Sequence, residues 1–375
     1  MVRILEFGMS SADKQGGVES YLINQYRHFD KNKIWCDFIS QGNSEIAYQE
    51  EIERNGSDIY NIYDRRKNPI KCFLYAIKLM YVISGKYDVF IMNFGGIPTC
   101  GFMFFLAYLA RIPTRIAHAH ASGLAGKRNF LKRFMDNFDY FFVKKFATDY
   151  WACSVPAGKF MFKDTDFEVI KNGIEVDKFK FSPSRRNIGR KKLCIGDDCI
   201  VVGSVGRIVP IKNYLFLIDV FFELHHICPN SKLMIVGDFR AKENEKYVKE
   251  VISRIEYHGL SNDVILHPFT ERISDLYQVF DVFVMTSIKE GLSLVSVEAQ
   301  AAGLPCLLST GIPDEAVILP DSTKRLSLED SHASWAREIF KLKDIKRFDT
   351  TDLVRKAGFD VVFETKRVEG LLGLK

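Results

Sequence analysis

The stretch that decides the fold is KEGLSLVSVEAQAAGLP, residues Lys289–Pro305. It follows Asp281–Met285, a short apolar run that predicts a buried strand. Ser293 is a residue type favoured at helix N-caps, and Gly303 with a proline soon after it is typical of a helix end. The apolar side chains between them recur on one helical face: Leu294, Val297 and Ala301. The segment therefore predicts a strand, a loop and a helix, which is the repeating unit of a parallel α/β sheet.

Two acids stand eight positions apart in this segment. Glu290 lies in the loop, just before the amides of Gly291, Leu292 and Ser293, which are expected to lie at a helix N-terminus that favours an anion. Glu298 lies two turns inside the helix, where a carboxylate can accept hydrogen bonds from a vicinal diol such as a ribose. The alternative is that both acids are ordinary helix-surface residues. The apolar neighbours of Glu298 make a solvated face harder to defend.

The alternation of strands and helices runs along the whole chain. In the first half, the predicted strands are Arg3–Phe7, Trp35–Ser40, Asp88–Asn93, Arg115–His120 and Asp149–Ser154. In the second half, they are Cys199–Val205, Lys232–Val236, Val264–His267, Asp281–Met285 and Pro305–Leu308. Helical periodicity fills the spaces between strands, for example at Tyr214–His226, Asn244–His258 and Ser293–Ala302. This pattern indicates an α/β fold with parallel sheets that helices cover on both faces.

A chain of 375 residues is long for one domain and fits two. The change of domain should fall within Asn172–Asp198, because this stretch is polar, basic and rich in turn residues. We interpret it as a linker. In open parallel sheets, ligands bind beyond the carboxyl ends of the strands, so the functional residues should follow strands.

The composition limits the kind of protein. Hydrophobic residues make up 47% and charged residues 26%, and the formal net charge of +5 does not indicate a nucleic-acid binder. The eight cysteines form no CxxC pair, so they predict neither a zinc site nor a disulfide framework but reduced thiols in a cytoplasm. The N-terminus predicts a first strand rather than a signal peptide, and no stretch reaches the ~20 apolar residues of a membrane span. A peripheral contact with a bilayer stays open.

Cations and glycines follow other predicted strands. In GSVGRIVPIKN, residues 203–213, Arg207 comes just after a strand and Lys212 comes just before a helix. Two cations at one sheet edge can clamp a diphosphate, although either one alone could be solvated. Gly16 and Gly17 open a helix after the first strand, where a paired glycine lets the backbone approach a phosphate or only makes a turn.

Two histidines lie near the end of a predicted strand in RIAHAHAS, residues 115–122. His118 and His120 are two positions apart, so they lie on the same side of the strand. They could bind a metal, but no third ligand is evident, and the ordinary alternative is a buried, hydrogen-bonded histidine. The DxD triplet Asp164–Asp166 does not follow a strand, and we do not interpret it as a metal motif.

These residues resemble a known family. The run from Ser287 to Leu292, followed by EAQAAGLP from Glu298, is similar to the E-x7-E signature of retaining glycosyltransferases of family 4, which have the two-domain GT-B architecture. The resemblance spans essentially the whole chain. It implies two Rossmann-like domains facing across a cleft. Residues 1–175 would bind the acceptor, residues 176–349 would bind the nucleotide sugar, and residues 350–375 would cross back to the first domain.

The resemblance also implies roles for single residues. Glu290 would contact the donor sugar, with Gly291, Leu292 and Ser293 near the sugar and phosphate, and Glu298 would bind the ribose. Arg207 and Lys212 would stabilise the leaving diphosphate. Gly16 and Gly17 would lie over the donor phosphates. His120 would lie beside the reacting bond, with His118 in support.

The reaction that the resemblance implies is transfer of a hexose or an N-acetylhexosamine from a nucleoside diphosphate sugar, with a UDP-sugar favoured, and with retention of configuration. The acceptor would be a glycan or a polyprenyl-diphosphate-linked saccharide of a cell-surface polysaccharide such as a capsule or exopolysaccharide. No metal or other cofactor is expected, because the fixed cations can neutralise the diphosphate. Two alternatives are a nucleotide-sugar epimerase or hydrolase on the same fold and a non-catalytic partner of another transferase.

The stretch from Lys127 to Phe146 combines phenylalanines at helical spacing with basic residues. Its phenylalanines are Phe130, Phe134, Phe138, Phe141, Phe142 and Phe146. A basic amphipathic helix can lie on an anionic membrane, which would suit a lipid-borne acceptor at the inner face of the membrane. The favoured alternative is a helix that packs its Phe stripe on the N-terminal sheet and leaves a basic face in solvent.

Overall fold

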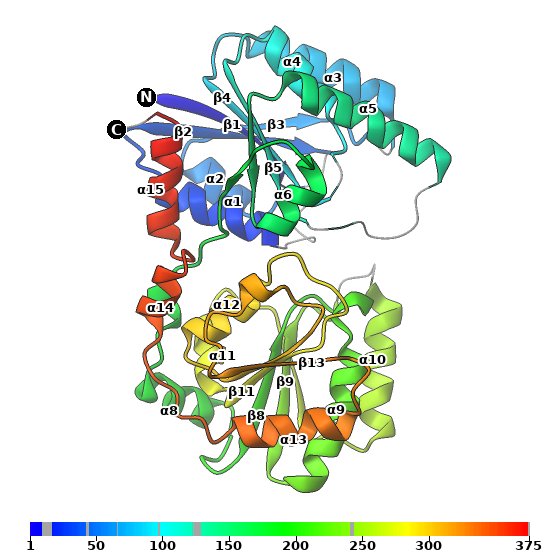
Figure 1. Cartoon of the computed structure of the whole chain (residues 1–375), viewed down its shortest axis with the longest axis vertical. Helices are drawn as coiled ribbons and strands as arrows, with labels where there is room; N and C mark the ends of the chain where they lie inside the picture. The colour runs from blue at the N-terminus through cyan, green and yellow to red at the C-terminus, as the bar shows by residue number, and fades with distance from the viewer. Residues whose placement is uncertain are drawn as a thin grey trace. The chain divides into compact units, whose positions relative to one another are not determined.

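A computed structural model describes residues 1–9, 17–42, 45–65, 67–96, 98–121, 123, 129–240 and 244–373. The chain divides into two compact units (Figure 1). The first unit comprises Met1–Gly173 with Val361–Lys375, and the second comprises Ile174–Asp360. Each unit is built on one parallel sheet, so the predicted α/β class with two Rossmann-like domains is confirmed.

The first unit contains a seven-stranded sheet in the order β3-β2-β1-β4-β5-β6-β7, with all neighbours parallel. Its strands are β1 (Val2–Met9), β2 (Ile34–Gln41), β3 (Ile59–Ile62), β4 (Val89–Phe94), β5 (Thr114–Ala119), β6 (Asp149–Ala152) and β7 (Glu168–Val169). All six residues of the central strand β4 are buried, as expected for a sheet covered on both faces. The sequence did not predict β3, a short edge strand whose residues are mostly not fully buried.

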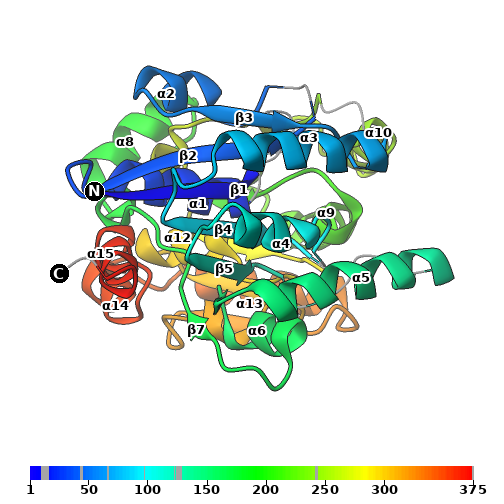
Figure 2. The same ribbon diagram turned by 90° about the horizontal axis from the view of Figure 1, so that it is seen from above.

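Helices cover both faces of this sheet. They are α1 (Gly17–His28), α2 (Gln49–Arg54), α3 (Pro69–Val82), α4 (Phe102–Leu109), α5 (Phe130–Phe146), α6 (Val155–Phe162) and α15 (Val361–Leu371). Right-handed crossovers place α1 and α2 on one face and α3, α4 and α5 on the other (Figures 1 and 2). The C-terminal helix α15 lies beside α1, and the Glu369 carboxylate accepts a hydrogen bond of 2.8 Å from the amide of Asp30.

Helix α5 packs differently from the favoured expectation. Phe142 and Phe146 contact Phe105 of α4, with ring centroids 5.9 and 5.0 Å apart. The other four phenylalanines of the stripe are exposed: Phe130, Phe134, Phe138 and Phe141. Packing of the whole stripe on the sheet is therefore wrong for these four. Lys127 and Arg128, at the start of the predicted segment, lie outside the described residues.

The second unit contains a six-stranded parallel sheet in the order β10-β9-β8-β11-β12-β13. Its strands are β8 (Ile200–Val205), β9 (Ser231–Gly237), β10 (Val264–Pro268), β11 (Val282–Met285), β12 (Cys306–Ser309) and β13 (Thr323–Leu326). Its helices are α7 (Val176–Phe179), α8 (Pro183–Lys192), α9 (Tyr214–Ile227), α10 (Glu245–Tyr257), α11 (Ile273–Val279), α12 (Leu294–Ala301), α13 (His332–Leu342) and α14 (Thr351–Lys356). The central strands β8 and β11 are neighbours, so their carboxyl ends meet at one edge.

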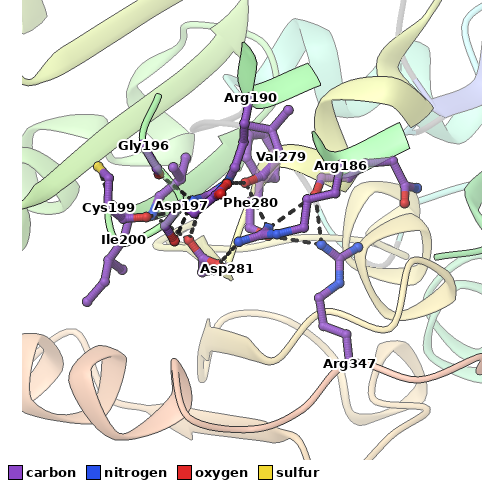
Figure 3. A network of polar contacts seen from close by, with 12 residues as sticks. Arg186, Arg190, Gly196, Asp197, Cys199, Ile200, Val279, Phe280, Asp281 and Arg347 are labelled. Carbon is purple, nitrogen blue, oxygen red and sulfur yellow. Dashed lines mark hydrogen bonds and ion pairs between the residues drawn. The ribbon is translucent and has the colours of Figure 1, made fainter. Parts of the chain in front are cut away.

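The segment that we interpreted as a linker is a packed helix. Arg190 of α8 is only 1% exposed, and its guanidinium reaches Asp281 (Figure 3). Arg186 binds the same carboxylate and donates to the carbonyls of Gln278, Val279 and Phe280, at the end of α11. A helix C-terminus attracts cations, so a basic helix is stable here. The linker interpretation of Pro183–Lys192 is wrong.

The first unit boundary lies between Gly173 and Ile174, inside the stretch Asn172–Asp198 where the change of domain was expected. The return to the first unit begins at Val361 rather than at residue 350. Residues 350–360 stay in the second unit, because the Thr350 hydroxyl donates to the carbonyl of Gln300 on α12 at 2.6 Å. Arg355 of α14 also forms an ion pair with Asp177 of α7.

Candidate functional site

An ion pair joins the ends of β8 and β11 in the second unit. The Lys212 Nζ atom lies 2.6 Å from Glu290 Oε1, and both side chains are 15% exposed. The pair therefore lies at a partly open surface of the carboxyl edge, where parallel sheets bind their ligands. The structure brings these two predicted residues into direct contact.

Backbone hydrogen bonds hold the two loops together. The Ile288 amide donates to Ile211 O at 2.8 Å, and the Glu290 amide donates to Gly311 O at 3.0 Å. The Thr286 hydroxyl donates to Lys212 O at 3.2 Å, so hydrogen bonds from the loop after β11 reach both the loop after β8 and, at Gly311, the loop after β12. The loops are thus fixed before any ligand binds, which favours a precise placement of charge.

Gly237 allows the ends of β8 and β9 to approach closely. A Cβ added at Gly237 would lie 2.4 Å from Gly206 O, so no other residue fits without a backbone shift. Gly206 lies against Lys212, since a Cβ at Gly206 would be 3.5 Å from Lys212 Cε. Arg207 follows directly and is exposed. The two predicted cations thus lie on the same loop after β8, with Lys212 paired and Arg207 in solvent.

Glu298 lies on α12 and binds a second group. Its Oε2 atom accepts a hydrogen bond of 2.9 Å from the hydroxyl of Tyr277, on α11. Burial raises the pKa of Glu298 to about 7, and the Tyr277 bond opposes this shift. The carboxyl group is therefore held in place and partly desolvated, ready to accept hydrogen bonds from a ligand.

The loop before α12 is only partly as predicted. Ser293 occupies the N-cap position of α12, but its hydroxyl makes no cap and lies 3.1 Å from Met285 Sδ. Gly291 and Leu292 are half-buried. Within the described part of the chain, the amides of Gly291, Leu292 and Ser293 donate to no protein acceptor. These amides at a helix N-terminus can receive an anion.

In the first unit, a hydrogen-bond chain crosses three neighbouring strands. Asn93 Nδ2 donates to Glu6 Oε2 at 2.9 Å and approaches Phe7 O at 3.3 Å. Because Phe7 O can only accept, the amide nitrogen of Asn93 faces this side and its Oδ1 faces His120. The His120 Nε2 atom, 3.0 Å from Asn93 Oδ1, must therefore carry a proton.

The two titratable groups of this hydrogen-bond network, the Glu6 carboxyl and the His120 imidazole, are uncharged at neutral pH. Burial raises the pKa of Glu6 to about 8, and burial lowers the pKa of His120 to about 3. The His118 ring lies 4.0 Å from the His120 ring, on the same side as predicted, and burial lowers its pKa as well. His120 is therefore a neutral imidazole that Asn93 orients.

We expect replacement of Glu6 by Gln to change how stability depends on pH. Between about pH 4.5 and pH 8 the unfolded chain has released the Glu6 proton that the folded protein keeps, so the free energy of unfolding falls as pH rises. Glu6→Gln removes this contribution. Urea unfolding from pH 5.5 to 8.5 measures this difference. As pH rises, the free energy of unfolding of the variant should increase relative to that of the wild type by up to about 1.4 kcal/mol per pH unit.

Glu53 provides the control, since it is exposed on α2 of the same unit. Glu53→Gln should keep the pH profile of the wild type. A Glu6→Gln profile parallel to that of the wild type would show that Glu6 is ionised in the folded protein.

Some of the remaining predicted residues are described by the structure and others are not. Gly17 begins α1, whereas Gly16 lies outside the described residues. Asp164 and Asp166 are exposed between α6 and β7. Among the described residues, no three His, Cys, Asp or Glu side chains gather in a way that could hold a metal ion.

Comparison with known proteins places the chain in a family. Residues 186–351 match the family described as glycosyl transferases group 1. A protein of Bacillus subtilis (strain 168), EpsF, is named as a glycosyltransferase and is 30% identical over 337 residues, which cover 88% of this chain and 85% of EpsF. The chain belongs to the group 1 glycosyltransferases.

Two further proteins are similar to this glycosyltransferase. The UDP-Gal:alpha-D-GlcNAc-diphosphoundecaprenol alpha-1,3-galactosyltransferase of Escherichia coli is 30% identical over 143 residues, or 38% of this chain and 36% of that protein. HepE of Anabaena, solved in complex with UDP and glucose, has a TM-score of 0.77 at 19% identity over the whole of both chains. The second likeness shows that the glycosyltransferase has the predicted GT-B fold.

The sequence did not indicate three residues that the structure brings to these sites. Tyr277 holds Glu298, and Asn93 and Glu6 orient His120. Glu6 and Asn93 carried a signal, because each is a polar residue inside an otherwise apolar strand. Tyr277 carried none, since a tyrosine in an apolar helix is indistinguishable from a core residue before its partner is known.

Proposed function

We propose that this glycosyltransferase moves a hexose or an N-acetylhexosamine from a nucleoside diphosphate sugar to a saccharide acceptor with retention of configuration. A UDP-sugar is the favoured donor. The acceptor is a glycan or a saccharide on polyprenyl diphosphate, in the synthesis of a cell-surface polysaccharide. The Escherichia coli relative supports this choice, since its name specifies a UDP-sugar donor and an acceptor on diphosphoundecaprenol.

The observation that carries the proposal is the Lys212–Glu290 pair at the carboxyl edge of the second sheet. Glu290 would accept hydrogen bonds from the donor sugar, and Lys212 would then face the diphosphate. Arg207 adds a second cation, and the amides of Gly291, Leu292 and Ser293 add donors for a phosphate oxygen. Glu298 would receive the two hydroxyls of the ribose.

The transfer step makes one bond and breaks one. The bond between C1 of the sugar and the β-phosphate oxygen breaks, and the acceptor oxygen bonds to C1 from the same face. The acceptor proton passes to the departing diphosphate, whose negative charge Lys212 and Arg207 stabilise. His120, held neutral by its environment and with its Nε2 proton donated to Asn93, would accept a hydrogen bond at Nδ1 beside the sugar but would not supply charge. The backbone at Gly16 and Gly17 would approach the donor phosphates.

We propose that no divalent ion is needed. The cations Lys212 and Arg207 and the amides before α12 would stabilise the charge of a diphosphate, which is the task that a metal has in other transferases. The first unit would bind the acceptor and the second unit the nucleotide sugar, at the inner face of the membrane where a lipid-borne acceptor is found.

The experiment has two stages. A thermal-shift screen with UDP-, GDP- and ADP-sugars identifies the donor, and the chosen donor is then incubated with and without a polyprenyl-diphosphate saccharide. We expect a glycosylated lipid with retained configuration only when the acceptor is present, and the same rate in EDTA. An epimerised or hydrolysed sugar without acceptor would identify a different enzyme, and a rate restored only by Mg²⁺ or Mn²⁺ would overturn metal independence.

A further inference from the structure

Helix α3 turns apolar side chains to solvent. Its buried residues are the small or flexible Cys72, Ala76 and Met80, which face the sheet. On the opposite side, a stripe at helical spacing is exposed: Ile70, Phe73, Leu74, Ile77 and Tyr81. A helix on the surface of a water-soluble protein normally shows polar and charged side chains on its exposed side. The exposed stripe of α3 is therefore the kind of surface that another molecule could cover.

Helix α5 carries a second apolar stripe. Phe130, Phe134, Phe138 and Phe141 follow one another at intervals of four, four and three, so they lie on one side of the helix. Phe130 is 87% exposed. Phe142 and Phe146, on the neighbouring side, attach the helix to α4. The exposed stripe is thus held by the packed one and cannot turn inward.

Helix α4 contacts both of the other two and lies between them (Figure 2). Phe102 of α4 packs edge-on against Phe73, with ring centroids 5.3 Å apart, and Tyr108 packs against Phe146 at 5.5 Å. Tyr108 and Leu109 are themselves exposed. We call the exposed apolar residues of the three helices the aromatic face: Ile70, Phe73, Leu74, Ile77, Tyr81, Tyr108, Leu109, Phe130, Phe134, Phe138 and Phe141.

Basic residues accompany the aromatic face. Helix α3 carries Lys71 and Lys78 and no acid. Helix α5 carries four more cations, all exposed: Lys132, Arg133, Lys144 and Lys145. Of its two acids, Asp139 is buried in an ion pair with Arg65. Lys145 Nζ lies 5.5 Å from the ring of Phe141, so cation and aromatic ring occupy the same surface.

We propose that the aromatic face docks this glycosyltransferase on an anionic lipid bilayer. Aromatic rings and aliphatic chains would enter the boundary of headgroups and acyl chains while the lysines meet the lipid phosphates. A second copy of the chain is a poorer occupant, because a twofold contact would bring the same cations together. Among the described residues, no helix is long and apolar enough to cross a bilayer, so the contact would be peripheral.

The test compares matched variants in vesicle binding. The full chain is sedimented with vesicles of phosphatidylcholine alone or with one quarter phosphatidylglycerol. Phe130→Ser with Phe134→Ser should lower the partition coefficient about tenfold on the anionic vesicles. Tyr257→Ser with Phe269→Ser is the control, since these aromatics are equally exposed (83% and 56%, against 87% and 62%) but lie outside the aromatic face.

A second pair tests the charge. Lys144→Gln with Lys145→Gln should weaken binding to the anionic vesicles about tenfold and leave binding to phosphatidylcholine unchanged. The proposal would be overturned if the Phe130→Ser/Phe134→Ser variant and the Lys144→Gln/Lys145→Gln variant bound the anionic vesicles as well as the wild type does. So would a dimer in sedimentation velocity that the Phe variants dissolve while no vesicle is bound.

The proposed function supplies the reason for docking, which is access to a lipid-borne acceptor, and the proposal rests on it in this respect only. Transfer to a detergent-solubilised acceptor measures the chemistry without a bilayer. Loss of vesicle binding with transfer retained would refute the aromatic face alone, whereas vesicle binding without any transfer would refute the proposed function alone.

Discussion

Replacement of Lys212 by Met should lower kcat by about a hundredfold to a thousandfold. Lys212 is the partly buried cation of the sheet edge, and under the proposed function its charge stabilises the departing diphosphate. Methionine keeps the length and apolar stem of the side chain but removes the charge. Because the leaving-group charge develops in the transition state, kcat should fall much more than the KM for the donor changes. Initial rates at varied donor concentration measure both.

The matched control is another lysine in an equally short ion pair. Lys249 Nζ lies 2.6 Å from Glu245 Oε1, but this pair is on the surface of α10. Lys249→Met should leave the kinetics unchanged. Glu290→Gln should also remove most turnover, since it takes the partner of Lys212 and the proposed sugar contact together. Full turnover in Lys212→Met would refute the assignment of the catalytic site to this edge.

Replacement of Asp281 by Ala should destabilise the second unit by about 3–5 kcal/mol. Asp281 accepts from Arg186, from Arg190 and from the amide of Val201 on β8. Arg190 is 1% exposed, so without Asp281 a buried cation loses its counter-charge. Arg347 adds to the cost, since it donates to Phe280 O beside the network (Figure 3). Chemical unfolding of the full chain measures the loss.

Two variants separate charge from general damage. Asp281→Asn keeps an acceptor but loses the charge, and it should lie between the wild type and Asp281→Ala. Glu245→Ala breaks an ion pair that is fully in solvent and should leave the unfolding curve unchanged. If Asp281→Ala unfolds like the wild type, the arginines of α8 are solvated in the native protein and do not hold it together.

Part of the candidate site was predictable from sequence. Lys212 and Glu290 lie 78 positions apart, yet each follows a predicted strand, and parallel strands end at one edge of a sheet. Their closeness therefore followed from the alternation of strands and helices, together with the family signature around Glu290. The hydrogen-bond partner of Glu298 could not be predicted from the sequence. Tyr277 belongs to a different helix, and only the packing of α11 on α12 brings its hydroxyl to the carboxylate.

Other errors have the same physical origin. The five cations at 185–192 suggested a linker because a charged stretch is solvated unless an acid meets it. That acid, Asp281, lies 91 positions beyond Arg190. The Phe stripe of α5 suggested packing on the sheet, because periodicity identifies an apolar side of a helix but not what lies against it.

The sequence by itself determined the α/β class, most strand and helix positions, and the acids and cations that follow the strands. These depend on local periodicity and on residue types at the ends of elements, which act over a few positions. Only the tertiary structure decided that α8 is part of a domain, that Glu6 and Asn93 orient His120, and that α3 and α5 show apolar stripes to solvent. Burial and pairing of this kind depend on residues that are distant in sequence, so the free energy that decides them appears only when the chain is packed.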